Sequence, residues 1–212
     1  MSNSIRDMFL IGLLLAVFGG VSADEPYRWY AAFGGGATFL NDNDTTQAGI
    51  TITSEFDSGG ALFGSVGATL GNFRAEGELF SSYNEVSAMT GNGITINTEG
   101  DFATVALMLN GYFDIPTGSK WRPYLGGGIG FANVSYNDIV LRGALVVNDD
   151  DTVFAYQAKA GISYAFSPRW DGTLGYRYFG TNNADFVDTT GFPFSADGVQ
   201  MHMIEVGARV RW

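Results

Sequence analysis

Cysteine is absent from this chain of 212 residues, and histidine occurs once, at His202. Without cysteine the protein has no disulfides, no thiolate chemistry and no zinc site of the cysteine type. Basic residues are also scarce, since 11 Lys and Arg stand against 22 Asp and Glu, which gives a formal net charge of -11. Because a nucleic-acid partner requires basic patches, we expect no nucleic-acid binding.

Long hydrophobic runs are missing as well. The apolar run Met8–Val21 has 14 residues, whereas a membrane-spanning helix needs about 20. Arg6 precedes this run, and small residues follow it at "VSA", which is the order found in a secretory signal peptide. The sequence therefore predicts a cleavable signal peptide at residues 1–23 and a single exported domain at residues 24–212.

Glycine and aromatic residues are abundant, and beyond Asp24 apolar and polar residues alternate. In "FRAEGELFSSY" (Phe73–Tyr83), this period of two places successive side chains on opposite faces of a strand. The eight alternating stretches are Tyr27–Phe39, Ala61–Leu70, Phe73–Tyr83, Phe102–Phe113, Trp121–Tyr136, Val153–Phe166, Trp170–Gly180 and Met201–Trp212. Long connections and short turns separate them in alternation, as in a transmembrane β-barrel with extracellular loops and periplasmic turns. We therefore expect an eight-stranded antiparallel up-and-down transmembrane β-barrel with both mature termini in the periplasm.

The two faces of these stretches differ in chemistry. One face is continuously apolar and ends in aromatic residues, which is typical of a lipid-facing surface with interfacial girdles. The other face is charged and rich in glycine, and eight strands leave an interior just wide enough for side chains. Since an unpaired buried charge costs several kcal/mol, we expect a lumen salt-bridge network with solvated bases at the rims. Its members are Arg28, Arg74, Glu76, Glu78, Arg122, Lys159, Asp171, Arg177, Glu205, Arg209 and Arg211.

Several motifs resemble a known family over nearly the whole mature chain. The most specific are "WRPYLGGGIG" (Trp121–Gly130), "GYRY" (Gly175–Tyr178) and the closing "HMIEVGARVRW". They resemble the opacity-protein-like, OmpA-type eight-stranded outer-membrane β-barrels of Gram-negative bacteria. The resemblance implies an integral outer-membrane protein in contact with lipid and lipopolysaccharide. It also implies that Trp212 serves as the C-terminal signal for the outer-membrane assembly machinery, where Phe is the usual residue.

The sequence offers weak candidates for chemistry. His202 and Glu205 have opposite parity on one strand, so they face different sides of the wall, and we expect no enzyme and no cofactor. Asp149, Asp150 and Asp151 are weak candidates for a divalent cation, because they lack the spacing of a calcium loop. The four long connections hold fourteen acids and one base, Arg142. Such a surface repels lipopolysaccharide unless divalent cations bridge the two.

Three functional readings follow from these patterns. The leading one is a monomeric envelope or surface-antigen protein that presents acidic loops to an extracellular ligand of unknown identity. A porin-like passive channel is the alternative, favoured by the glycine-rich inner face and opposed by the charged lumen. A soluble lipocalin-like binder is a remote third, because that fold requires an apolar interior and a water-facing exterior.

Overall fold

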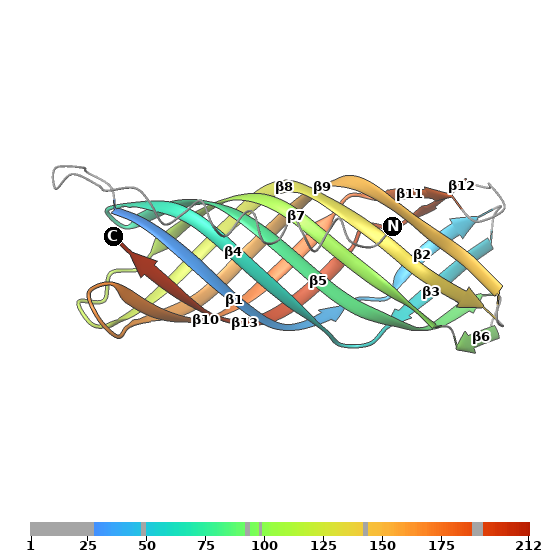
Figure 1. The fold of residues 1–212 in the computed structure, drawn as a ribbon, viewed down its shortest axis with the longest axis horizontal. Coiled ribbons are helices and arrows are strands. Elements are labelled where there is room, and N and C mark those ends of the chain that lie inside the picture. The colour runs from blue at the N-terminus through green and yellow to red at the C-terminus, as the bar shows by residue number, and fades with distance from the viewer. Residues whose placement is uncertain (1–27, 48–49, 92–93, 98, 142–143, 188–192) are drawn as a thin grey trace.

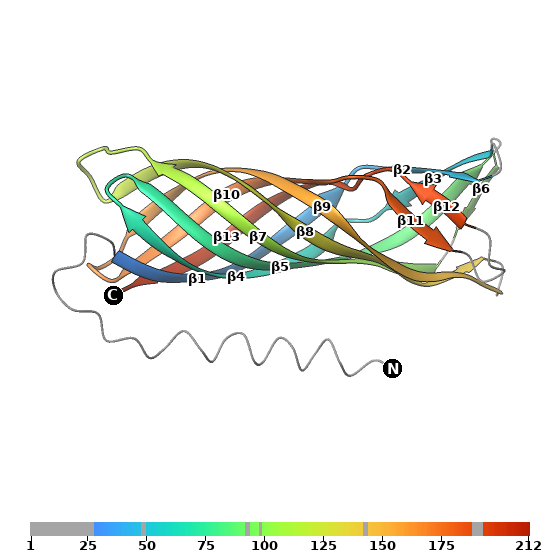
Figure 2. The same cartoon turned by 90° about the horizontal axis from the view of Figure 1, so that it is seen from above.

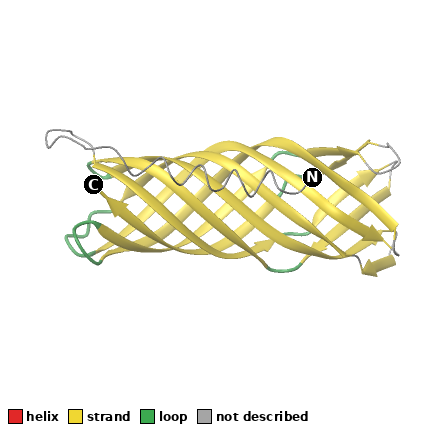
Figure 3. Ribbon diagram, viewed as in Figure 1, coloured by secondary structure: helices red, strands yellow, loops and turns green. Residues whose placement is uncertain are grey.

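The structure is a computed structural model, and it describes residues 28–47, 50–91, 94–97, 99–141, 144–187 and 193–212. The predicted signal peptide and the base Arg142 lie outside these ranges. The regular structure in the described ranges is β-strand (Figure 3). None of the described residues belongs to a helix long and apolar enough to cross a membrane.

Eight long strands close into an antiparallel barrel, which confirms the predicted fold (Figure 1). They are β1 (Arg28–Leu40), β4 (Gly59–Leu70), β5 (Phe73–Gly91), β7 (Glu99–Asp114), β8 (Trp121–Leu141), β9 (Ala144–Ala165), β10 (Trp170–Thr181) and β13 (Gln200–Arg211). Each pairs with the next one along the chain, and β13 pairs with β1 to close the ring. A closed ring leaves no unpaired backbone edge in the lipid.

Five shorter strands extend the barrel at the end away from the C-terminus (Figures 1 and 2). They are β2 (Asn43–Gln47), β3 (Ile50–Phe56), β6 (Ile94–Asn97), β11 (Ala184–Val187) and β12 (Pro193–Ala196). The ladder β11-β12-β2-β3 continues onto the half of β5 that lies away from the short turns. We call these four strands, together with that half of β5, the outer sheet. Much of the long connections predicted as loops is therefore strand, and Asp149–Asp151 belong to β9. The pairing of β12 with β2 joins segments that are remote in sequence, such as Ser195 with Thr46, and local alternation did not identify β2, β11 or β12 as strands.

The exterior of the barrel follows the predicted parity. On β7 the exposed fraction alternates from 68% at Leu107 to 2% at Met108 and 66% at Leu109. All four tryptophans are exposed on the outer wall at the short-turn end, at the beginnings of β1, β8 and β10 and just after β13. Such a tryptophan belt marks a membrane–water interface.

The interior divides into two parts along the barrel axis. Charged side chains fill the half nearest the short turns. Beyond Glu78 on β5 and before Glu205 on β13, the inward positions carry no charge and are mostly apolar, with Phe80, Met201 and Met203 almost fully buried. We call the apolar half the plug; it is the buried cluster that contains Phe80, Phe102, Ala106, Met108, Val134, Val153, Phe179, Phe186, Met201 and Met203.

Candidate functional site in the barrel lumen

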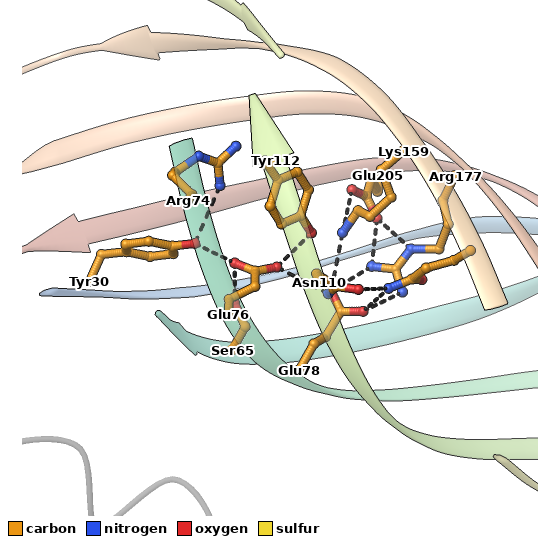
Figure 4. Close-up of polar contacts among 11 residues, drawn as sticks. Tyr30, Ser65, Arg74, Glu76, Glu78, Asn110, Tyr112, Lys159, Arg177 and Glu205 are labelled. Atoms are coloured by element: carbon orange, nitrogen blue, oxygen red, sulfur yellow. Dashed lines mark hydrogen bonds and ion pairs between the residues drawn. The ribbon is translucent and has the colours of Figure 1, made fainter. Parts of the chain in front are cut away.

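A four-residue ring of alternating charge lies at the centre of the lumen (Figure 4). Arg177 donates to both oxygens of Glu78 at 2.9 and 3.0 Å, and to Glu205 at 2.9 Å. The Lys159 ammonium lies 3.1 Å from each of these two carboxylates. All four side chains are buried, and two acids balance two bases. Burial of such ions is tolerated because every charge is paired and hydrogen-bonded.

Glu76 is held differently, by neutral donors. The hydroxyls of Tyr30 and Tyr112 donate to its two oxygens at 2.8 and 2.6 Å, and Ser65 and Asn110 add bonds at 3.2 and 3.3 Å (Figure 4). No ion pair to Glu76 occurs among the described residues. Four donors to one carboxylate supply the stabilisation that a cation otherwise provides.

The short-turn end of the lumen holds two further acids, Asp171 and Asp114, each paired with arginine. Asp171 is almost fully buried and is shared by Arg209 at 2.8 Å, Arg211 at 2.7 Å and the more distant Arg122 at 3.7 Å. Arg74 binds Asp114, with its Nε 3.0 Å from both carboxylate oxygens. We refer to all these ion pairs, the central ring and the Glu76 cluster as the lumen network.

The structure places ten of the eleven residues that we expected in the network around the lumen. Arg28 is the exception: it is exposed at the rim, where β1 begins. Asp114, which we had assigned to a turn, joins the network instead, and its inward parity with Asn110 and Tyr112 was the overlooked signal. With Asp114 in place of Arg28, the lumen network has six bases and five acids. The set expected from the sequence had seven bases and four acids, so the observed network is closer to neutrality.

The glycines on the inner face of β8 make room for neighbouring side chains. Gly126, Gly128 and Gly130 pair with Tyr112, Asn110 and Met108 of β7, and a Cβ at each glycine would collide with that partner's side chain. These glycines therefore accommodate large residues of β7 and do not widen the lumen.

The plug is joined to the network through aromatic contacts. The rings of Phe80 and Phe179 stack with centroids 5.3 Å apart, and the Arg177 guanidinium lies 4.5 Å from the centroid of Phe80. The Lys159 ammonium lies 4.9 Å from the centroid of Phe63. A cavity of about 30 Å³ borders Glu76, Tyr112 and Lys159, which is space for about one water molecule.

The remaining candidates lie outside the lumen. His202 faces outward, with its Nδ1 2.6 Å from the Tyr176 hydroxyl, whereas Glu205 points inward. Asp150 accepts a hydrogen bond from Asn133, and Asp151 accepts one from the backbone of Asp185. In the described ranges, no group of three acidic or histidine side chains is arranged to hold a metal ion.

A closed barrel with an apolar exterior and a charged lumen defines an integral outer-membrane β-barrel of the Gram-negative envelope. The chain belongs to the outer membrane protein beta-barrel domain family, whose model matches residues 9–211. It is 34% identical over 86 residues to uncharacterized proteins of Brucella abortus and Brucella suis, a match that covers 37% of this chain and 30% of those proteins.

Solved structures share the fold at low sequence identity. Neisserial surface protein A is 18% identical with a TM-score of 0.54, and the similarity covers 89% of this chain and 98% of that one. The outer membrane protein OprG of Pseudomonas aeruginosa is 14% identical with a TM-score of 0.57, covering 85% and 95%. At such identities the similarity is one of fold.

Proposed function

We propose that this protein is a closed, non-enzymatic outer-membrane barrel that presents an acidic sheet at the cell surface. The observation that carries the proposal is the filling of the lumen by two successive layers, the network and the plug. Ions crossing the barrel would have to break the buried ring around Arg177 and then displace the stacked pair Phe80 and Phe179. Each step costs several kcal/mol, which opposes a passive channel.

The orientation in the membrane is part of the proposal. The short turns and the C-terminus lie at one end, and the outer sheet lies at the other (Figure 2). Barrels of this class have short periplasmic turns, so we place the outer sheet outside the cell and both mature termini in the periplasm. We also propose that the signal peptide is cleaved before Asp24.

The acidic surface supports a role in surface interaction. Exposed acids at the end of the barrel that carries the outer sheet are Asp42, Asp44, Asp57, Glu85, Asp150, Asp185 and Asp197. This charge favours cationic ligands, or lipopolysaccharide bridged by divalent cations. We propose that the barrel acts as a monomer and requires no cofactor.

Planar-bilayer recording tests the closed barrel. We expect the wild-type protein to show no discrete conductance steps. A variant that combines Phe80→Ala, Phe179→Ala, Glu78→Ala and Arg177→Ala removes the largest side chains of both layers, and we expect it to conduct if it folds. Regular steps from the wild type would contradict the proposal and favour the porin-like alternative, for which the glycine-rich face of β8 is the supporting feature.

A further inference from the structure

Three arginines converge on a single acid at the mouth of the lumen, at the short-turn end. The guanidiniums of Arg209, Arg211 and Arg122 lie 2.8, 2.7 and 3.7 Å from the carboxylate of Asp171. Arg209 and Arg211 belong to β13 and Arg122 belongs to β8, so the three side chains reach this carboxylate from two parts of the wall. Because all three guanidiniums surround one small group, they also lie close to one another.

Arg28 adds a fourth positive charge at this mouth. It precedes Tyr30 by two residues on β1, so it shares the inward parity of that buried residue, and Tyr30 pairs directly with Arg211. The charge of Arg28 repels the Arg211 guanidinium, as do the charges of Arg122 and Arg209. We call Arg28, Arg122, Arg209 and Arg211 the arginine cluster.

The acids around the arginine cluster do not balance its charge. Asp171 contributes one negative charge, and even if a terminal carboxylate at Trp212 is counted as a second, four positive charges leave a surplus of two. Other acids of the lumen network are engaged elsewhere. Asp114 is bound by Arg74, the central ring is neutral in itself, and the oxygens of Glu76 are taken by four neutral donors.

Several N–H donors of the cluster also lack an acceptor. Arg122 lies 3.7 Å from Asp171, which is too long for a hydrogen bond, and its side chain is partly exposed. Arg28 is exposed and forms neither an ion pair nor a side-chain hydrogen bond with another residue in the described ranges. The Nε of Arg211 is buried and has no hydrogen-bond partner. Since a buried donor without an acceptor is costly, an incoming acceptor would be favoured here.

We propose that the arginine cluster binds a phosphate group, either as inorganic phosphate or as a water-soluble phosphate monoester. Such a group carries a charge of about −1.5 to −2 at pH 7 and at least three acceptor oxygens, which match the surplus charge and the free donors. Guanidinium forks suit phosphate geometry. A single carboxylate fits less well, because it brings one charge and only two oxygens.

The position of the cluster restricts the source of the ligand. Arg28, Arg122 and Arg211 share the inward face of the wall, so they meet water at the mouth and not the lipid outside. The central ring and the plug fill the lumen behind the cluster, so phosphate would bind at a closed end without crossing. Binding does not depend on the orientation in the membrane, whereas the assignment of the ligand to the periplasm rests on the proposed orientation.

Isothermal titration calorimetry tests the site, with folded protein in micelles of an uncharged detergent and with inorganic phosphate or phenyl phosphate as the ligand. We expect the wild type to bind both. In Arg28→Gln/Arg122→Gln, which removes two guanidiniums with free donors, we expect binding to weaken by about a hundredfold, or about tenfold for each arginine. Arg28→Lys/Arg122→Lys keeps the charge but removes the forks, so its loss should be intermediate. Gel mobility without heating verifies that each variant is folded.

Lys120→Gln/Arg169→Gln is the matched control, because it removes the same charge from two exposed turn residues at the same end of the barrel. At one fixed ionic strength we expect it to weaken binding by less than about threefold. Equal weakening in this control would indicate diffuse attraction and overturn the site, as would a wild type that binds neither phosphate. Binding of phosphatidic acid alone would place the phosphate at the lipid face and refute the lumen mouth. None of these outcomes bears on conductance, so the closed barrel is tested independently.

Discussion

Removing the carboxylate of Glu78 is the most direct test of the central ring. Glu78 is fully buried, and it accepts two hydrogen bonds from Arg177, one from Lys159 at 3.1 Å and one from Gln157 at 2.9 Å. In Glu78→Ala, the ring would hold two bases against Glu205 alone. Breaking a buried ion pair by deleting one partner costs about 3–5 kcal/mol, and we expect a loss of that size in the free energy of unfolding.

The assay is equilibrium unfolding by guanidinium chloride in lipid vesicles, followed by tryptophan fluorescence and by gel mobility without heating. Glu78→Gln retains the shape and part of the hydrogen bonding, so we expect a smaller loss of about 1.5–3 kcal/mol. Asp57→Ala removes an exposed acid that directly follows β3 and should change stability by less than about 0.5 kcal/mol.

A double-mutant cycle separates the ion pair from simple loss of volume. In Glu78→Leu/Arg177→Met, Lys159 loses Glu78 but remains paired with Glu205, so no buried base is left without an acid. We expect the double variant to be more stable than the summed losses of the single variants Glu78→Leu and Arg177→Met predict, by about 0.5–3 kcal/mol. Additive losses, or a loss below about 1 kcal/mol in Glu78→Ala, would refute the view that the ring is a coupled unit.

Three further predictions concern the wall, the terminus and the leader. Leu107→Arg faces lipid and should lower folding stability in vesicles by about 2–4 kcal/mol, whereas Leu107→Phe should be nearly neutral; equal effects would contradict the assignment of the outer face. Trp212→Asp should reduce the yield of assembled protein in the outer membrane far more than Trp29→Asp at the same interface, and equal yields would argue against a terminal signal. Intact mass of the purified protein should match a chain that begins at Asp24, and a full-length mass would exclude cleavage there.

Local sequence was sufficient for the wall of the barrel. The period of two in stretches such as Phe73–Tyr83 specified the strands, and the sorting of parities specified which face meets lipid. The reason is that successive side chains of a strand point to opposite faces, whatever the strand pairs with. The short turns were equally readable, because Gly71 and Gly118 adopt positive φ angles of 60° and 67° that favour glycine.

Tertiary structure decided what each inward side chain meets. Parity placed Glu78 and Arg177 inside, but their pairing across 99 residues depends on the stagger of strands that are not neighbours. Parity also placed Met108 inside, and the structure shows that it belongs to the plug and not to the charged network. Arg28 shares the inward parity yet ends at the rim, because burial depends on depth along the axis as well as on face.

The outer sheet also required the tertiary structure. The strands β2, β11 and β12 are too brief to be distinguished from loops by periodicity. β2 becomes a strand because β12, about 150 residues away, pairs with one of its edges and β3 with the other. The sequence by itself thus determined the strands of the barrel and their two faces, which are local properties of the chain. The ion pairs, the plug and the outer sheet arise from contacts between distant segments, which exist only once the barrel has closed.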